Sequence, residues 1–413
     1  MMSQPDGHLL SGLRVIDAAS FIAGPVAATI LADLGADVIK IEPPHGDPYR
    51  HRTGGPGVPE SPYNYRWIVD NRTKRGLALD LRHAPGREVL QRLVARSDVY
   101  ITNNPLGSRA RLGTRWEDLS LLNPRLIYAS ITAYGERGDE APLTGYDATA
   151  LWARTGLMDL VKPTPDAAPA RSLPGMGDHP TGAALFGAIM TALYRRERTG
   201  RGSMVSTSLL ANGLWMNAIQ VQAALSGATV EPRPPREDAA SALANLYRCS
   251  DGRWFLLNVI DDGKDWEALL RAIERPDLND DRRFTTTEAR RVHARALIAV
   301  LDHVFASRSW NEWQTALTKH TLTHGAVGTV HDARHDRQMT ASGALVPIDD
   351  PRAGAPLTVS SPLELEGVEK VPPRLAPELG EHSVEILRET GYDDDAIERL
   401  LAAGVVVQGK SAG

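Results

Sequence analysis

Short apolar runs and amphipathic stretches alternate from the start of the chain. Residues 13–18 and 36–42 are apolar runs typical of strands, and residues 26–34 between them repeat apolar positions at helical spacing. A Gly-Pro pair precedes this helix and Gly35 follows it. A strand, a helix and a strand within about thirty residues predict a βαβ unit with two parallel strands.

The same alternation continues for roughly another hundred residues. Extended runs and helical patterns follow one another, with strands expected at residues 76–81, 98–102 and 125–132 and helices at residues 86–96 and 116–122. These segments belong to one sheet of four or five strands. The fold class predicted is therefore α/β, with a Rossmann-like large domain built on a parallel sheet.

One long helix and a proline-rich segment divide the rest of the chain. The helix is expected to run from Pro180 to a basic turn at residues 195–198, before Gly200. Residues 231–238 are rich in proline and charge, so a domain boundary is expected near residues 226–238. A strand pair and two helices after it would form a smaller α/β domain, and two short helices would end the chain.

Composition excludes several classes of protein. The 413 residues are 42% hydrophobic and 23% charged, which suits about two globular domains. The net charge of −5 and the short, scattered basic groups argue against a nucleic acid partner. Cys249 is the only cysteine, which excludes an intrachain disulfide and a Cys-based metal cluster. No apolar run reaches ~20 residues and residues 1–10 lack a signal-peptide pattern, so a cytoplasmic protein without a membrane partner is expected.

The loop at residues 20–25 leaves the first strand and enters the first helix. At this position α/β folds bind phosphate groups on backbone N–H groups. Glu42 ends the next strand, where dinucleotide enzymes carry the acid that binds ribose. However, the loop lacks G-x-G-x-x-G and carries Pro25 in place of a free amide. A dinucleotide-dependent oxidoreductase is therefore disfavoured and kept as an alternative.

Two aspartates precede helical stretches and allow two interpretations. Asp178 stands in residues 174–182 (PGMGDHPTG), where the positive end of the long helix should keep its carboxylate ionised and able to attack a carbonyl carbon. Asp147 stands in residues 145–149 (GYDAT), ahead of another helical stretch. Either residue could instead be an N-cap, and chemistry alone favours capping for both.

Other catalytic arrangements find little support. His179 follows Asp178, but adjacent residues at a helix entry point in different directions, which argues against an Asp-His relay. The H-E-x-x-H motif of zinc proteases and the G-x-S-x-G motif of serine hydrolases are both absent. Neither a metal site nor a serine nucleophile is predicted.

Several separated motifs resemble one known family. In chain order they are residues 10–17 (LSGLRVID), 23–25 (AGP), 31–42 (LADLGADVIKIE), 46–50 (GDPYR), 71–80 (NRTKRGLALD), 195–202 (RRERTGRG) and 376–382 (APELGEH). Together they resemble the class III coenzyme A transferases, which include formyl-CoA transferase and the carnitine CoA-transferases. The resemblance implies an enzyme that moves CoA from an acyl-CoA to a carboxylic acid, with these two substrates as its small-molecule partners and no prosthetic group.

The resemblance also implies site residues. The family nucleophile, which forms an aspartyl anhydride and then an aspartyl-CoA thioester, falls on Asp178, and a second carboxylate falls on Asp147. Coenzyme A would bind along the first loop and the loops after the following strands, near Ile22, Ala23, Leu79, Arg82, Asn103 and Arg111. Arg82 and Arg111 would meet its phosphate groups.

Two positions refine this expectation. α-Methylacyl-CoA racemases share the fold but pair the aspartate with a histidine where this chain has Tyr146, whose phenol is a weak base at neutral pH. A racemase is therefore the runner-up, and a catalytically silent CoA-binding protein is a further alternative. Ile22 stands where some transferases carry glutamine, and the glycine-rich lid of formyl-CoA transferase has no counterpart in residues 231–247. An acceptor other than oxalate is expected.

The family architecture implies how the chain is arranged. Residues 1–225 would form the N-terminal part of the large CoA-binding domain, residues 226–329 the small domain, and residues 330–413 would return to the large domain. The family fold is an interlocked homodimer in which each chain forms a ring threaded by the other. Self-association is therefore expected.

Overall fold

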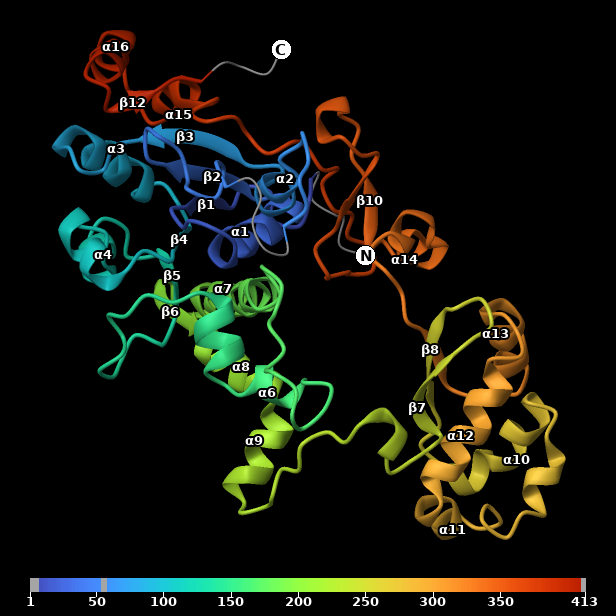
Figure 1. Cartoon of the computed structure of the whole chain (residues 1–413). Helices are drawn as coiled ribbons and strands as arrows, with labels where there is room; N and C mark the ends of the chain where they lie inside the picture. The colour runs from blue at the N-terminus through green and yellow to red at the C-terminus, as the bar shows by residue number, and fades with distance from the viewer. Residues whose placement is uncertain (1–6, 53–57, 410–413) are drawn as a thin grey trace. The chain divides into compact units, whose positions relative to one another are not determined.

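The computed structural model describes residues 7–52 and 58–409 (Figure 1). The chain divides into two compact units. The first comprises Met1–Met158, Arg171–Thr229 and Arg337–Gly413, and the second comprises Asp159–Ala170 and Val230–Asp336. The chain divides after Thr229 and Asp336, which is four and seven residues beyond the boundaries expected at residues 225 and 329. Residues 159–170, which the sequence assigned to the large domain, belong to the second unit.

A seven-stranded sheet forms the centre of the first unit within the described residues. Its strands are β1 (Arg14–Asp17), β2 (Asp37–Glu42), β3 (Arg75–Leu79), β4 (Val99–Thr102), β5 (Ile127–Thr132), β6 (Ser203–Ser208) and β12 (Val406–Val407). Their spatial order is β12-β3-β2-β1-β4-β5-β6, and every pairing except that of β12 with β3 is parallel. The α/β fold with a large parallel sheet is confirmed.

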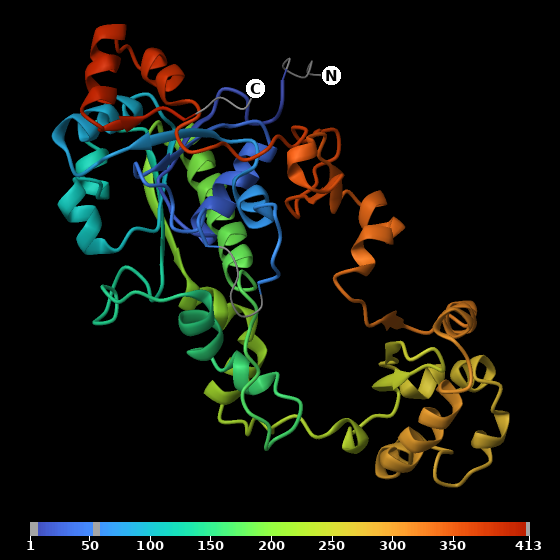
Figure 2. The same cartoon turned by 45° about the horizontal axis from the view of Figure 1, so that its top comes forward.

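Apolar residues alternate between the two faces of this sheet, so each face needs its own cover of helices. Val15 and Val38 pack against α1 (Ala23–Asp33) and α7 (Asp178–Thr199). Ile16 and Ile39 face the other way, toward α3 (Ala84–Val94), α15 (Ser383–Glu389) and α16 (Asp394–Ala402). In Figures 1 and 2 the red C-terminal helices accordingly lie beside the blue strand β3.

The chain order of the strands reverses between β1 and β4. From β1 the chain proceeds outward through β2 and β3, and it then returns to β4 on the other side of β1 before continuing to β5 and β6. The loops that leave β1 and β4 therefore diverge in opposite directions. In open α/β sheets the crevice between two such loops, at the carboxyl ends of the strands, is the usual place for a ligand.

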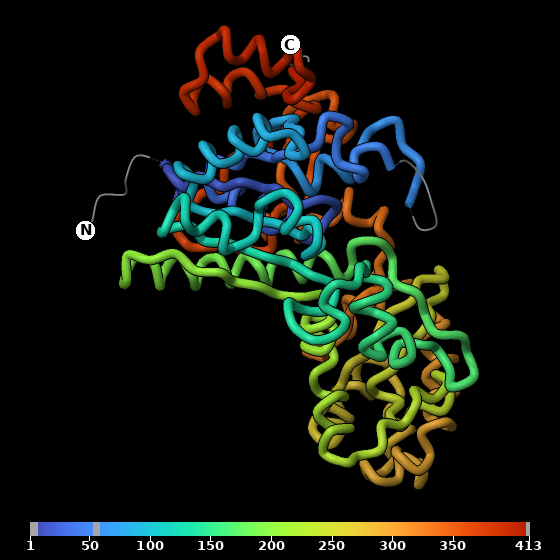
Figure 3. The backbone as a smooth tube through the Cα atoms, turned by 90° about the vertical axis from the view of Figure 1, so that its left-hand side faces the viewer, coloured from blue at the N-terminus to red at the C-terminus, as the bar shows by residue number. Residues whose placement is uncertain are grey.

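The helices α1 and α7 pack closely on one face of the sheet, and Figure 3 shows α7 as one long green helix. The close approach depends on Gly182, because a Cβ there would lie 2.7 Å from the backbone oxygen of Ala23 and 2.7 Å from a methyl group of Val26. Both helices begin near this contact. The absence of a side chain at Gly182 therefore brings the start of α7, at Asp178, toward the loop that enters α1.

Shorter elements complete the first unit. The helices are α2 (Tyr65–Asn71), α4 (Leu106–Leu112), α5 (Trp116–Leu119), the π-helix η1 (Asp147–Ala153), α8 (Leu209–Met216), α9 (Ala218–Leu225) and α14 (Arg337–Ala341). The helix α6 (Leu157–Leu160) spans the division between the units. The strands β10 (Leu345–Pro347) and β11 (Leu357–Val359) form a separate antiparallel pair.

The second unit has its own core. Its antiparallel sheet contains β7 (Ala244–Arg248), β8 (Trp254–Asn258) and β9 (His324–Ala326). The helices that pack with this sheet are α10 (Asp262–Ala272), α12 (Ala294–Phe305) and α13 (Trp310–Lys319), and the short helix α11 (Thr287–Val292) precedes α12. Cys249 is buried in this core, and burial raises the pKa of its thiol to about 11, so the thiol is protonated and unreactive at neutral pH. No described helix is both long and apolar enough to span a membrane.

The packing at Gly182 can be tested by adding one methyl group. We expect Gly182→Ala to destabilise the protein by about 1–3 kcal/mol, because the new Cβ forces α1 and α7 apart. Gly187→Ala is the matched control, since it lies in the same helix and a Cβ there meets nothing within 4 Å. The control should be neutral or more stable by roughly 0.5–1 kcal/mol. Urea unfolding curves measure both, and equal midpoints would contradict the close-packing argument.

Candidate active site

A cavity of about 570 Å³ opens at the carboxyl edge of the sheet, where the strand order reverses. Residues 20–23, from the loop after β1, and residues 103–105, from the loop after β4, line it on adjacent sides. The segments that carry Asp147 and Asp178 complete the lining. The structure therefore brings both aspartates to the ligand position that the parallel sheet creates.

Asp178 is the first residue of α7 and not its N-cap. Gly177 occupies the N-cap position, and no side-chain capping bond is formed there. Among the described residues no group donates a hydrogen bond to the Asp178 carboxylate. The carboxylate faces the cavity, so its oxygens are free to meet a ligand. The capping interpretation of Asp178 is therefore wrong, as is the expectation that the helix starts at Pro180.

Asp147 holds the loop that carries Asp178. One of its carboxylate oxygens accepts hydrogen bonds from the backbone N–H groups of Gly175, at 3.1 Å, and Gly177, at 3.2 Å. The other oxygen accepts from the N–H of Ala148 at 2.7 Å. A Cβ at position 177 would lie 2.8 Å from the Cβ of Asp147, so glycine is needed for this approach. Asp147 is itself buried and positions the residue before Asp178.

The environment of Asp178 raises its pKa to about 7. Burial is the largest cause, and the negative charges of Asp147 and, to a smaller extent, Asp70 act in the same direction. The positive charge of His179 opposes them. The helix N-terminus was expected to keep this carboxylate ionised, whereas burial and like charge favour its protonated form.

His179 binds Asp70 and leaves Asp178 free. Its Nε2 lies 3.0 Å from Asp70 Oδ1, and its Nδ1 lies 3.0 Å from the backbone oxygen of Gly175. The other oxygen of Asp70 accepts a hydrogen bond from the Tyr49 hydroxyl at 2.9 Å. As the sequence predicted, Asp178 and His179 do not form a relay, but His179 has a different carboxylate partner.

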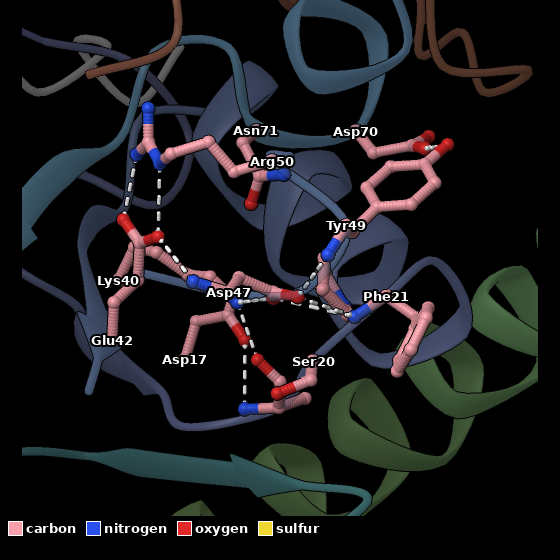
Figure 4. Close-up of polar contacts among 12 residues, drawn as sticks. Asp17, Ser20, Phe21, Lys40, Glu42, Asp47, Tyr49, Arg50, Asp70 and Asn71 are labelled. Atoms are coloured by element: carbon pink, nitrogen blue, oxygen red, sulfur yellow. Dashed lines mark hydrogen bonds and ion pairs between the residues drawn. The ribbon is translucent and has the colours of Figure 1, made fainter. Parts of the chain in front are cut away.

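The loop after β1 holds Phe21 in a strained conformation. The φ angle of Phe21 is 63°, a left-handed value that costs about 1–3 kcal/mol for a bulky residue. Its N–H points at the carboxylate of Asp47, at 3.3 and 3.4 Å (Figure 4). The Asn103 side chain accepts a hydrogen bond from the N–H of Ser20 and donates one to its carbonyl. The ring of Phe21 meets the ring of Tyr146 edge-on at 5.8 Å. The clamped loop therefore places an aromatic face in the cavity.

A chain of buried charges lies beneath this loop (Figure 4). Lys40 Nζ lies 3.2 Å from Asp47 and 3.9 Å from Asp17, and it also binds the backbone oxygen of Ala19. Asp17 in turn lies 2.8 Å from Lys74 Nζ. All four charged side chains are essentially inaccessible to solvent, so each depends on the next for its counter-charge.

Glu42, the candidate ribose-binding acid, is already occupied. Its side chain is 1% exposed, and it binds the Arg50 guanidinium at 2.6 Å and the N–H of Asp47 at 2.9 Å. These contacts fix the turn after β2. They leave Glu42 no freedom to bind the hydroxyl groups of a ribose, which weighs against the dinucleotide alternative.

The six expected CoA-contacting residues separate into two groups. Ile22, Ala23 and Asn103 line the cavity with Asp147 and Asp178. The other three do not line the cavity. Leu79 is the last residue of β3, and its side chain is 1% exposed in the core. The Arg82 guanidinium, after β3, binds Asp80 at 2.6 Å, and the Arg111 guanidinium, after β4, binds Ser108 at 2.8 Å. Leu79 therefore presents only its backbone to the following loop.

Sequence reasoning missed the partners of the site. Asp47 and Tyr49 stand in the GDPYR motif, and Asp70 immediately precedes the NRTKRGLALD motif. Their positions within or beside these motifs were the available signal, but nothing in the sequence pairs Asp70 with His179. Within residues 7–52 and 58–409 no group of His, Cys, Asp and Glu is arranged to hold a metal ion.

Comparison with known proteins identifies the relatives of this chain. Residues 10–383 match the family model of CoA-transferase family III. The (R)-2-hydroxy-4-methylpentanoate CoA-transferase of Clostridioides difficile is 30% identical, with 96% of this chain and 99% of the relative covered. The succinyl-CoA:glutarate CoA-transferase of Mus musculus is also 30% identical, with 97% and 90% covered. The crystal structure of a CAIB/BAIF family protein from Brucella suis matches with a TM-score of 0.81 and 31% identity, covering 93% of this chain and 100% of that protein.

Proposed function

Because the chain belongs to CoA-transferase family III and is an enzyme of that class, we propose that it transfers coenzyme A between carboxylic acids with Asp178 as its nucleophile. The observation that carries this proposal is that Asp178 lines the cavity at the switch point of the sheet and that its carboxylate accepts no hydrogen bond from any residue that the structure describes. The acyl-CoA thioester and the acceptor acid would occupy this cavity in turn.

The proposed reaction has four steps that balance without an external energy source. The Asp178 carboxylate attacks the thioester carbonyl, the C–S bond breaks, and a mixed anhydride and CoA thiolate form. The thiolate attacks the Asp178 carbonyl of this anhydride, which releases the first acid and leaves an aspartyl-CoA thioester. The acceptor carboxylate attacks that thioester, again expelling the thiolate. The thiolate then attacks the acceptor's acyl carbon, so that acyl-CoA leaves and the Asp178 carboxylate returns.

The chain's own groups supply alignment and exclusion of water. Asp147 fixes the backbone of Gly175 and Gly177, so Asp178 is held in one place throughout the exchange. The apolar groups of Phe21 and Ile22 shield the anhydride, which water would otherwise hydrolyse. Tyr146 stands where the racemases carry histidine, so a base for removing an α-proton is missing from that position, and racemisation is not favoured.

The proposal also covers self-association, the cellular compartment and the path of the CoA moiety. A second copy of the chain would interlock with the first to form a homodimer. The single cysteine, Cys249, suits a reducing compartment such as the cytosol. The CoA moiety would extend from the cavity along the loops after β3 and β4, toward Arg82 and Arg111, which are both exposed.

The nucleophile can be tested with an isotope. If acceptor acid labelled with ¹⁸O in its carboxylate is turned over, the bridging oxygen of the second anhydride remains on Asp178. We expect mass spectrometry to find ¹⁸O in the peptide that contains Asp178. Asp178→Ala should lower the rate of CoA exchange by roughly 10³-fold or more. Asp139→Ala, at an exposed aspartate, is the matched control and should retain full activity. Turnover without label in that peptide would contradict the proposal.

The pH dependence follows from the raised pKa of Asp178. Only the carboxylate form attacks, so kcat/KM should be low below the pKa and should rise as the pH increases through about 7. An ordinary aspartate would give this rise near pH 4. Initial rates at limiting acyl-CoA between pH 5.5 and 8.5 measure the profile, corrected for spontaneous thioester hydrolysis. A profile that is flat across this range would show that Asp178 is fully ionised throughout.

The cavity wall indicates the kind of acid that is accepted. Tyr146 and Leu173 line the cavity and are exposed at 58% and 56%. The other apolar side chains of the lining are those of Phe21, Ile22 and Leu209, and its cationic side chains are those of Arg52, Arg66 and Arg171. A substrate with an aliphatic or aromatic group would cover the apolar side chains, which oxalate would leave uncovered.

A panel of acceptor acids tests this preference. We expect kcat/KM for branched or aromatic monocarboxylates to exceed that for oxalate by roughly tenfold or more. Ile22→Gln should reduce this ratio of kcat/KM values, because the substitution adds a polar group to the cavity wall. Leu121→Gln, at an 83% exposed position, should leave the ratio unchanged. A preference for oxalate by the unaltered enzyme would contradict the apolar subsite.

A further inference from the structure

We propose that His179 is an imidazolium at neutral pH, which Asp70 holds beside the nucleophile, and that this cation positions Asp178 and sets the pH at which it becomes reactive. The effect on Asp178 rests on the proposed function, whereas the charge state of His179 stands on geometry alone. His179 is a positioning residue in this proposal, because its ring contacts Asp70 and Gly175 and does not line the cavity.

The two polar contacts of the ring indicate its protonation state. Nδ1 lies 3.0 Å from a backbone carbonyl oxygen and Nε2 lies 3.0 Å from a carboxylate oxygen. A carbonyl oxygen cannot donate a hydrogen, so the Gly175 contact needs a hydrogen on Nδ1. A neutral imidazole would then turn the lone pair of Nε2 toward the Asp70 carboxylate, whereas an imidazolium forms an ion pair with it. The two contacts together favour the cation.

Asp70 is held in place by contacts of both its side chain and its backbone. Its side chain is 0% exposed, and its second oxygen accepts the hydroxyl hydrogen of Tyr49 at 2.9 Å. The Tyr49 phenol cannot compete for a negative charge, because burial and the charge of Asp70 raise its pKa far above the usual range. On the other side of Asp70, its backbone carbonyl accepts hydrogen bonds from Lys74 Nζ at 2.9 Å and from the Thr29 hydroxyl at 2.6 Å. The ion-pair partner of His179 is therefore fixed through both its side chain and its backbone.

The charges around His179 support the same assignment. Burial lowers its pKa, but the hydrogen bond and charge of Asp70, the Gly175 carbonyl and the charge of Asp178 outweigh this and raise it to about 9. The other charged groups nearby are Asp147, which acts on Asp178, and Arg66, whose guanidinium lies 5.0 Å from the Tyr49 ring. His179 is the neighbouring cation that lowers the pKa of Asp178 against burial and Asp147.

The same contacts hold the nucleophile loop from two sides. Asp147 draws the N–H of Gly175 in one direction, and His179 binds the carbonyl of the same residue in the other. Gly175 is thereby fixed three residues before Asp178. Removing the imidazolium would both raise the pKa of Asp178 and loosen the peptide that orients it.

The cation can be observed directly, without any turnover. Histidine labelled with ¹⁵N in the full-length protein reports ring protonation by NMR, and the His179 signal is identified by its loss in His179→Gln. We expect both nitrogens to be protonated at pH 7.5 and to titrate near pH 9. In Asp70→Asn the titration should move down to the ordinary histidine range or below it. An ordinary pKa in the unaltered protein, unmoved by Asp70→Asn, would overturn the assignment.

The role in catalysis has a separate measurement. His179→Gln and Asp70→Asn should lower kcat/KM at pH 7 by roughly 10- to 100-fold, with most of the loss in kcat, and should move the rising limb of its pH profile to higher pH. Raising the pH should therefore recover part of the activity, which a merely structural defect would not allow. His303→Gln, at an exposed helix position, is the control. If the pH profile of kcat/KM does not move in either variant, His179 has no role in tuning Asp178. If ¹⁸O is not transferred to Asp178, the proposed function is wrong, but the protonation state of His179 measured by NMR still stands.

Discussion

The arrangement of the site depends on an alternating row of buried charges, Asp47, Lys40, Asp17 and Lys74, at the carboxyl ends of β1 and β2. Burying any one of these charges alone would be strongly unfavourable, so each is retained only because its neighbour compensates it. The row links segments that are distant in sequence, because Lys74 also binds the carbonyls of Pro25 and Asp70. The positions of the loop after β1 and the end of α2 are therefore coupled.

Each end of this row supports a different part of the site. At one end Asp47 holds the N–H of Phe21 and keeps that residue in its left-handed conformation, which places an aromatic wall opposite the nucleophile. At the other end Lys74 fixes the backbone of Asp70, whose side chain holds His179 beside Asp178. The strain at Phe21 and the charge on His179 thus depend on groups that never touch the substrate.

The sequence predicted most of the sheet because β1 to β5 and the helices α1, α3 and α5 follow local apolar periodicity, whereas it did not predict α2 and α4. It missed β6, whose residues Ser203–Ser208 are polar and become a strand only by pairing with β5, and it missed β12, a two-residue strand that depends on β3. In the site it predicted Asp178 and Asp147 as catalytic residues through resemblance to a family, and both line the cavity. It could not pair His179 with Asp70, because that contact is set by how α2 and α7 pack and not by either local pattern.

In the proposed mechanism the pKa of Asp178 decides which of the two carbonyl groups of the mixed anhydride the CoA thiolate attacks. A carboxylate of higher basicity attacks the thioester more readily but leaves more slowly than the substrate acid. The CoA thiolate is therefore steered to the Asp178 carbonyl, which favours the aspartyl-CoA thioester in the first half of the reaction. The same bias slows the last step, in which Asp178 itself must leave. Burial and the charge of Asp147 raise the pKa of Asp178, and the charge of His179 lowers it. These opposing effects keep the basicity of Asp178 close to that of the substrate acids, so that both the formation and the breakdown of the aspartyl-CoA thioester can proceed.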